Sequence, residues 1–112
     1  MFVNDCLNIN EKGHLTIGGC DTVELAKEYG TPLYVLDENT IRTTCRSYVE
    51  SFKKFYNGNG MPLYASKALS CKELCRIANE EHLGLDVVSG GEIYTAQQLS
   101  LIHISEPTRP RL

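Results

Sequence analysis

A single lysine stands where a lysine is not expected. Lys67 ends the run Leu63–Lys67, in which alternating side chains predict a buried strand and give Lys67 the same face as Leu63 and Ala65. Burying an ammonium group is unfavourable unless the group is paired or neutral, and desolvation lowers the pKa of a lysine until its amine becomes nucleophilic. Such an amine is suited to an imine with an aldehyde. The alternative is that Lys67 merely ends the strand and reaches water.

A carboxylate lies near the end of the next predicted strand. Asp86 belongs to the apolar run from Leu83 to Val88. Adjacent parallel strands lie about 4.8 Å apart, so this carboxylate could approach the Lys67 amine or a cofactor bound to it. Both residues would lie at the carboxyl ends of strands, where α/β sheets and barrels bind ligands. An aspartate at that place can equally cap the following turn.

A serine and two glycines open the helix expected after that strand. Ser89, Gly90 and Gly91 would expose backbone amides at the positive end of a helix dipole, a feature that can bind phosphate. Ser89 and Glu92 also have the spacing of a capping box, which explains the same residues without a ligand.

The cysteines and histidines do not form a metal-binding pattern. Cys71 and Cys75 could share a helix face, but no second pair or histidine follows at the spacing of a zinc site. His14 and His82 have no nearby nucleophile in the sequence to activate. We therefore expect no metal, and buried reduced thiols explain the five cysteines.

Strand and helix patterns alternate along the chain. The strongest pattern is a helix from about residue 39 to 56, in which apolar residues recur every three or four positions. The expected elements are, in order, a strand at 14–17, a helix from Asp21 to Gly30, a strand at 32–36, the helix at 39–56, a strand at 61–68, a helix opened by Ser70, a strand at 83–88 and a helix opened by Ser89. This order predicts an α/β fold with parallel strands joined by right-handed crossovers.

The composition argues against two kinds of partner. The net charge is -3 and the basic residues are scattered among acids, so we expect no nucleic-acid surface. No apolar run is long enough to cross a bilayer, so we expect no membrane span. The first residues lack the features of a signal peptide, which makes the cytoplasm the expected location.

Three segments together resemble the diaminopimelate decarboxylase family. The first holds Gly18-Gly19-Cys20-Asp21 and the run from Glu24 to Glu38, which is similar to the entry segment of these enzymes. Tyr64–Ala68 resembles the strand that carries the cofactor lysine, and Leu85–Tyr94 resembles the next strand and helix start. The likeness covers most of residues 2–98.

The resemblance implies a fold and a reaction. Residues 21–98 would form part of a TIM-like (β/α)8 barrel that binds pyridoxal 5'-phosphate, and residues 1–20 would supply a strand to a β domain. The implied reaction is decarboxylation of meso-2,6-diaminopimelate, an amino acid, to L-lysine, with Lys67 holding the cofactor covalently and Asp86 beside it. The full-length enzyme would be a homodimer. The phosphate-binding glycines of this family lie further along the chain, which weakens the phosphate interpretation of Ser89–Gly91.

Residues 99–112 do not continue the likeness. They are similar to translated sequencing-adapter DNA, their apolar residues leave the helical phase, and Pro107 and Pro110 prevent a helix. We expect this tail to be non-native, so that only two or three of the eight βα units are present and the chain alone is inactive.

Other functions stay open at this point. A decarboxylase of the same fold that acts on ornithine, arginine or carboxynorspermidine is the nearest alternative. A non-catalytic homeostasis protein that binds pyridoxal phosphate shares a cofactor lysine but would not need the strand before residue 20. A small interaction domain becomes the better interpretation only if residues 99–112 are genuine.

Overall fold

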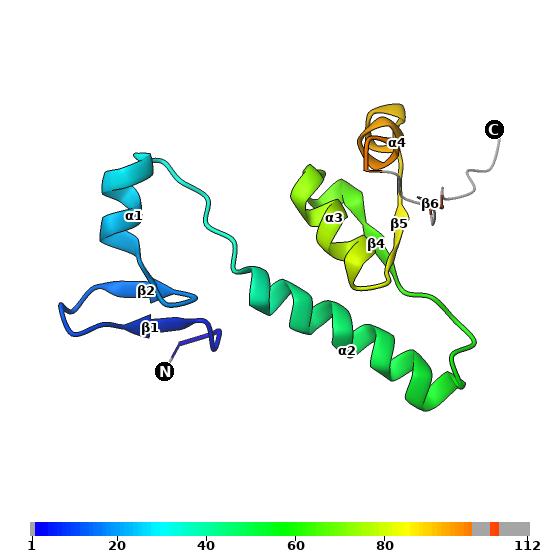
Figure 1. Ribbon diagram of the computed structural model, residues 1–112, viewed down its shortest axis with the longest axis horizontal. Helices are drawn as coiled ribbons and strands as arrows, with labels where there is room; N and C mark the ends of the chain where they lie inside the picture. Colours follow the sequence, from blue (N-terminus) through cyan, green and yellow to red (C-terminus); the bar gives the residue numbers. More distant parts are fainter. Residues whose placement is uncertain (1, 100–103, 106–112) are drawn as a thin grey trace. The chain divides into compact units, whose positions relative to one another are not determined.

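A computed structural model describes residues 2–99 and 104–105 (Figure 1). The chain divides into two compact units, Met1–Ile41 and Arg42–Leu112, each with its own secondary structure. Among the described residues, no helix is long and apolar enough to cross a bilayer.

The first unit contains a small antiparallel sheet. Its strands are β1 (Leu7–Ile9), β2 (Leu15–Ile17) and β3 (Cys20–Asp21), in the order β1-β2-β3. The predicted strand at 14–17 is confirmed to within one residue, whereas β1 and β3 were not expected. Each of them has three residues or fewer, which is too short for a periodic pattern to show in the sequence.

Helix α1 (Thr22–Tyr29) begins and ends where the sequence predicts. Asp21 is its N-cap, and its carboxylate accepts hydrogen bonds from the backbone N–H groups of Val23 (2.8 Å) and Glu24 (3.3 Å). Gly30 ends the helix with a φ of 82°, a left-handed value that favours glycine.

The predicted strand at 32–36 is wrong. Its residues belong to no helix or strand, and the side chain of Tyr34 is 99% exposed. The run has strand-forming residues, but a strand also needs a neighbour for its backbone hydrogen bonds. Among the described residues no strand pairs with it, so its composition alone was misleading.

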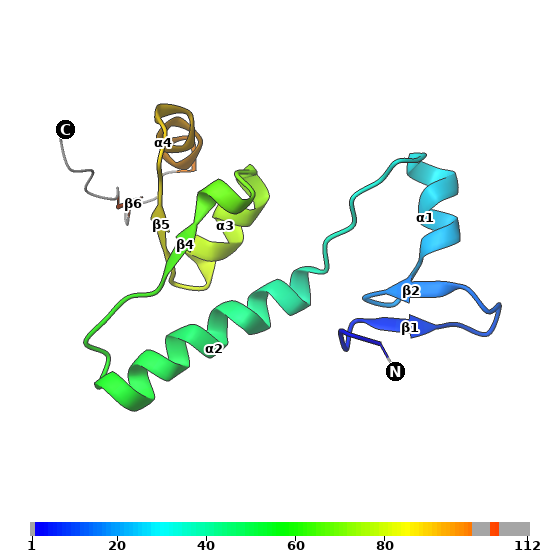
Figure 2. The same cartoon turned by 180° about the vertical axis from the view of Figure 1, so that it is seen from behind.

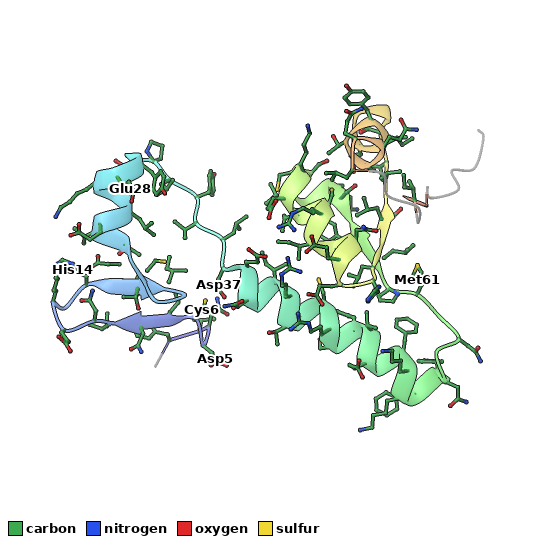
Figure 3. The ribbon with its side chains drawn as sticks, in the orientation of Figure 1. Asp5, Cys6, His14, Glu28, Asp37 and Met61 are labelled. Carbon is green, nitrogen blue, oxygen red and sulfur yellow. The ribbon has the colours of Figure 1, made fainter. Side chains whose placement is uncertain are left out.

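Helix α2 (Glu38–Tyr56) confirms the helix predicted at 39–56. Asp37 lies just before it (Figure 3), where its Oδ2 accepts hydrogen bonds from the Thr40 backbone N–H (2.9 Å) and hydroxyl (2.5 Å). These bonds lower the pKa of Asp37, against a smaller opposing effect of burial. The carboxylate therefore stabilises the start of the helix.

The second unit confirms the predicted α/β class. Its sheet has the order β4-β5-β6, with strands β4 (Leu63–Ala65), β5 (Gly84–Asp86) and β6 (Ile104–Ser105) paired in parallel. A single 3-10 turn, η1 (Ser66–Ala68), follows β4, and the helices α3 (Lys72–Glu80) and α4 (Gly90–Gln97) follow in turn.

Two local predictions in this unit need correction. The strand predicted at 61–68 is limited to the three residues of β4, because the chain turns into η1 at Ser66. The helix predicted to open at Ser70, from the capping-box spacing of Ser70 and Glu73, starts one residue later: Cys71 is the N-cap of α3, and it has no side-chain cap hydrogen bond. The spacing of a capping box is common enough to occur by chance.

The core of the second unit lies between the sheet and its helices (Figure 2). Leu83, Leu85 and Val87 alternate along and beside β5, so they share one face, and all three are buried. They pack with Cys75 and Ala78 from the α3 helix and with residues of α2 and α4. Burying one such leucine or valine side chain contributes about 1.5–3 kcal/mol.

Helices α2 and α3 are also joined by ion pairs around Glu81. The carboxylate of this residue is buried and accepts hydrogen bonds from the guanidinium groups of Arg46 (2.8 and 2.9 Å) and Arg42 (3.0 Å). These two partners lower the pKa of Glu81, Arg46 more than Arg42, while burial opposes them. The cluster fixes α2 against the end of α3.

Part of the segment 99–112 contributes to the fold. Ile104–Ser105 pairs with β5, and Leu99 and Ile104 pack against the core. This contribution was not expected from the sequence. An open strand edge accepts any extended segment with suitable side chains, and Ile104 is β-branched and apolar. The non-native origin of residues 99–112 stays a prediction, and the remainder of this segment lies outside the described residues.

Candidate functional site

Lys67 lies in the turn that directly follows β4. It is the middle residue of η1, not a strand residue, and its side chain is exposed. The expectation of a buried lysine in a strand is therefore wrong. Strand alternation stops at Ala65, so it does not fix the direction in which Lys67 points.

Asp86 lies at the corresponding end of the neighbouring strand. It is the last residue of β5 and pairs in register with Ala65, the last residue of β4. Because the strands are parallel, the Lys67 turn and Asp86 lie at the same edge of the sheet, the carboxyl edge. This is the edge at which α/β sheets and barrels bind ligands.

Ala65 and Asp86 belong to the side of the sheet that the helices leave open. Ala65 and Asp86 alternate with Tyr64 and Leu85, which pack into the helix-covered core. Asp86 is half-buried. Within residues 2–99 and 104–105, however, the Lys67 amine forms neither a hydrogen bond nor an ion pair with Asp86 or any other group. The backbones of Lys67 and Asp86 thus lie at one edge, and the Lys67 amine has no partner among the described residues.

A buried serine connects the lysine turn to helix α4. Ser66, the residue before Lys67, is 1% exposed. Its Oγ lies 2.5 Å from Oε1 of Glu92 and 3.0 Å from the backbone oxygen of Asp86. From the sequence, Glu92 was expected only as part of the helix cap. Residues 26 positions apart leave no local pattern, so this contact could not be predicted.

The capping prediction at the start of α4 is confirmed. The Glu92 backbone N–H donates to Ser89 Oγ (3.3 Å), and the Ser89 hydroxyl donates to Glu92 Oε2 (2.8 Å). The Val88 backbone N–H donates to the same carboxylate oxygen (3.3 Å). Hydrogen bonds from Ser66 first and Ser89 second lower the pKa of Glu92, and burial opposes them. Ser89 is thus occupied as a cap, in line with the weakened phosphate interpretation.

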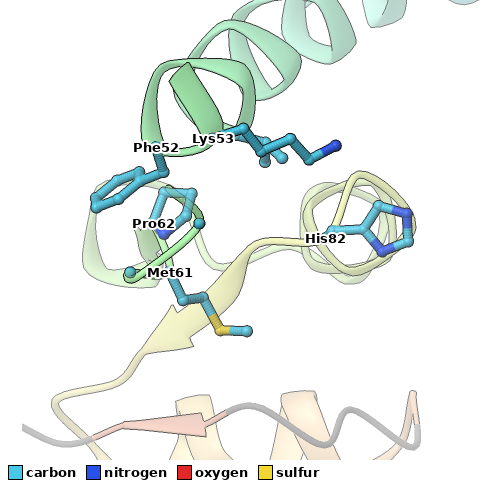
Figure 4. Close-up of a pocket in the computed structure, with 8 residues that line it drawn as sticks. Phe52, Lys53, Met61, Pro62 and His82 are labelled. Carbon is cyan, nitrogen blue, oxygen red and sulfur yellow. The ribbon is translucent and has the colours of Figure 1, made fainter. Parts of the chain in front are cut away.

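A small apolar pocket lies at the other end of the sheet (Figure 4). Its volume is about 150 Å³, and it is lined in part by Phe52, Met61, Pro62 and His82. Met61 and Pro62 precede β4, and His82 precedes β5, so the pocket adjoins the amino ends of the strands. It is separate from Lys67 and Asp86.

The carboxyl edge offers the groups needed to hold an aldehyde cofactor. A primary amine stands on a short turn that a buried hydrogen bond anchors, and a carboxylate ends the adjacent strand. No group of three or more histidine, cysteine or acidic side chains in the described part of the chain could hold a metal ion. The amine and the neighbouring carboxylate fit an organic cofactor that is linked through an amine.

The chain belongs to the pyridoxal-dependent decarboxylase family. Residues 38–108 match its pyridoxal binding domain, which includes Lys67, Asp86 and the Ser66–Glu92 contact.

Its relatives include several diaminopimelate decarboxylases. The chain is 50% identical over 96 residues to the enzyme of Bacillus methanolicus, covering 86% of this chain and 22% of that protein. It is 51% identical over 90 residues to the enzyme of Methanothermobacter thermautotrophicus, covering 80% and 21%. A crystal structure of diaminopimelate decarboxylase from M. jannaschii in complex with L-lysine matches with a TM-score of 0.82 and 36% identity, covering 95% of this chain and 25% of that one. The chain thus spans about a fifth to a quarter of the length of these relatives.

Proposed function

We propose that a full-length protein containing this chain decarboxylates meso-2,6-diaminopimelate to L-lysine with pyridoxal 5'-phosphate. The observation that carries the proposal is the register of β4 and β5, which pairs Ala65 with Asp86 and so gathers the Lys67 turn and a carboxylate at one edge. The names of the relatives support the substrate, since the similar proteins from B. methanolicus and M. thermautotrophicus are diaminopimelate decarboxylases.

Lys67 is the residue proposed to hold the cofactor. When bound, pyridoxal phosphate supplies an aldehyde for the covalent link and an electron sink for the charge left by loss of CO2. The Lys67 amine is exposed and has no internal partner among the described residues, so no ion pair has to break before it reacts. Asp86 is half-buried on the adjacent strand, and we propose it as the carboxylate that lies beside the Lys67 amine and orients it.

The test compares two lysine variants of the full-length protein. Lys67→Ala should lower the rate of CO2 release from meso-diaminopimelate by several orders of magnitude, because it removes the nucleophile. Lys72→Ala is the matched control, since Lys72 is exposed at the first turn of α3. Borohydride reduction of the wild type followed by peptide mapping should place the cofactor on Lys67. Full activity in Lys67→Ala would refute the assignment.

The same assay tests the substrate. Ornithine and arginine, offered beside meso-diaminopimelate at equal concentration, should give a much lower kcat/KM. A preference for either of them would move the protein to another decarboxylase of the same family. Reduction that labels Lys67 without any decarboxylation would instead favour a non-catalytic pyridoxal-phosphate protein.

We also propose that the full-length protein is a homodimer, as the resemblance to diaminopimelate decarboxylases implies, and that it acts in the cytoplasm. Sedimentation of the purified protein would test the dimer. A monomer with full activity would contradict it.

A further inference from the structure

The carboxylate of Glu92 connects the lysine turn to two other segments. Its Oε1 faces the hydroxyl of Ser66, one residue before Lys67, and its Oε2 accepts hydrogen bonds from the Ser89 hydroxyl and the Val88 backbone. The two oxygens therefore hold η1 on one side and the start of α4 on the other. A helix cap alone needs only the hydrogen bonds to Oε2.

The Ser66 hydroxyl has one proton and two nearby acceptors. It donates to one acceptor at a time. The 2.5 Å distance to Glu92 Oε1 lies in the range of a charge-assisted O–H to carboxylate bond, whereas the 3.0 Å distance to the Asp86 backbone oxygen is that of a weaker contact. The stronger bond is thus the one to Glu92.

Burial makes this bond harder to replace with water. Ser66 is 1% exposed, and Glu92 is half-buried. Without Glu92 the buried hydroxyl keeps only the weaker acceptor, the Asp86 backbone oxygen, so the arrangement that keeps the stronger bond is favoured.

We propose that Ser66 and Glu92 are positioning residues for Lys67. Their hydrogen bond fixes the turn η1 to the start of α4 and so sets the direction in which the Lys67 amine leaves the end of β4. The inference rests on the proposed function, because it assigns the constraint to the cofactor lysine of that same site. Neither residue is required to touch the cofactor.

The proposal predicts a specific kinetic pattern. When the Lys67 amine is held loosely, the substrate still binds through other groups of the site. Loss of the constraint therefore lowers kcat and leaves KM nearly unchanged. A purely structural role would lower the amount of folded protein without changing kcat per active site.

The test uses two shape-matched variants of the full-length protein. Ser66→Thr keeps the hydroxyl. Ser66→Val introduces a side chain of nearly the same shape as threonine, but without the hydroxyl. We expect kcat for meso-diaminopimelate, per cofactor-loaded site, to fall by about 10- to 100-fold in Ser66→Val relative to Ser66→Thr, with KM changed by less than about threefold. Equal kcat values in the two variants would overturn the proposal.

A second variant covers the case in which the buried site rejects both branched side chains. Glu92→Gln keeps the size of the side chain but removes its charge, and only one of its two terminal atoms can accept a hydrogen bond, so the bond from Ser66 is either lost or loses its charge assistance. We expect the same fall in kcat. Glu73→Gln is the matched control, because Glu73 is an exposed glutamate of α3 whose carboxylate pairs only with Arg76 among the described residues.

Hydrogen–deuterium exchange gives a readout that needs neither cofactor nor activity. In the cofactor-free full-length protein, a peptide covering residues 63–70 should exchange several times faster in Glu92→Gln than in the wild type and in Glu73→Gln. Unchanged exchange together with unchanged kcat would overturn the proposal.

The two proposals fail in different ways. If Lys67→Ala keeps full activity, the proposed role of the lysine is wrong whatever the exchange data give. If Lys67→Ala is inactive while Glu92→Gln matches the wild type in both kcat and exchange, the proposed function stands and the positioning role is refuted.

Discussion

At the scale of single residues, the carboxylate of Asp21 both caps helix α1 and accepts hydrogen bonds from two other side chains. Its Oδ1 caps α1, and its Oδ2 accepts hydrogen bonds from Asn10 Nδ2 (2.7 Å) and from His14 Nδ1 (2.9 Å), which lies in the turn before β2 (Figure 3). Burial alone would raise the pKa of this carboxyl group. The bonds from His14, Asn10 and the α1 backbone outweigh that effect and hold the pKa well below the ordinary value.

This shift predicts how the first unit responds to acid. Because the folded pKa is depressed, the stabilisation is complete above the unfolded value of about 3.9 and is lost as the pH falls through the lower folded pKa. An NMR titration of the Asp21 carboxyl carbon should therefore have its midpoint below 3.9, and the Val23 and Glu24 amide shifts should move with it.

Asp21→Asn is the control for this titration. Asparagine caps helices as well as aspartate does but does not ionise, so the acid-dependent movement of the two amide shifts should disappear while α1 persists. A midpoint at or above the ordinary value in the wild type would contradict the prediction.

At the scale of elements, β5 is the centre of the second unit. It pairs with both β4 and β6 and carries the buried residue Leu85 in the core. Its other face presents Asp86 at the candidate site. One strand thus links the stability of the core to the placement of a functional carboxylate.

The burial of Leu85 predicts a large loss of stability when its side chain is truncated. Leu85→Ala removes a side chain that is 1% exposed and should lower the free energy of unfolding by about 2–5 kcal/mol. Leu85→Met is the matched control, because methionine nearly keeps the volume of the side chain, and it should cost less than about 1.5 kcal/mol. Chemical denaturation of the full-length variants measures both values, and equal losses would contradict a closely packed Leu85 in the core.

At the scale of the whole molecule, the parallel sheet is open. It has three strands in the described residues, whereas a (β/α)8 barrel needs eight. Apolar side chains on or beside β4 and β5, such as Leu63 and Val88, are 45% and 37% exposed. Open strand edges and exposed apolar groups favour association between chains.

We therefore expect the 112-residue chain by itself to be marginally stable and inactive. Purified alone, it should aggregate or melt without a sharp transition, and it should release no CO2 from meso-diaminopimelate when pyridoxal phosphate is added. Calorimetry and the decarboxylation assay measure these outcomes. A cooperative melt of a soluble monomer would contradict the expectation. So would a cofactor adduct that borohydride reduction fixes on Lys67 and on no surface lysine.

The sequence by itself determined the elements whose signals are local. The apolar spacing over 39–56 predicts α2, and the capping residues Asp21 and Ser89 mark the starts of α1 and α4, because caps and helix faces depend on residues a few positions apart. The resemblance in the segments around Lys67 and Asp86 also predicted the family to which the chain belongs.

Only the tertiary structure decided the features that depend on distant partners. The run at 32–36 has strand-forming residues but finds no paired neighbour, and Lys67 lies on an exposed turn because β4 ends at Ala65. The contact between Ser66 and Glu92 joins residues 26 positions apart. Such pairings follow from how strands and helices pack in space, which no short window of the sequence contains.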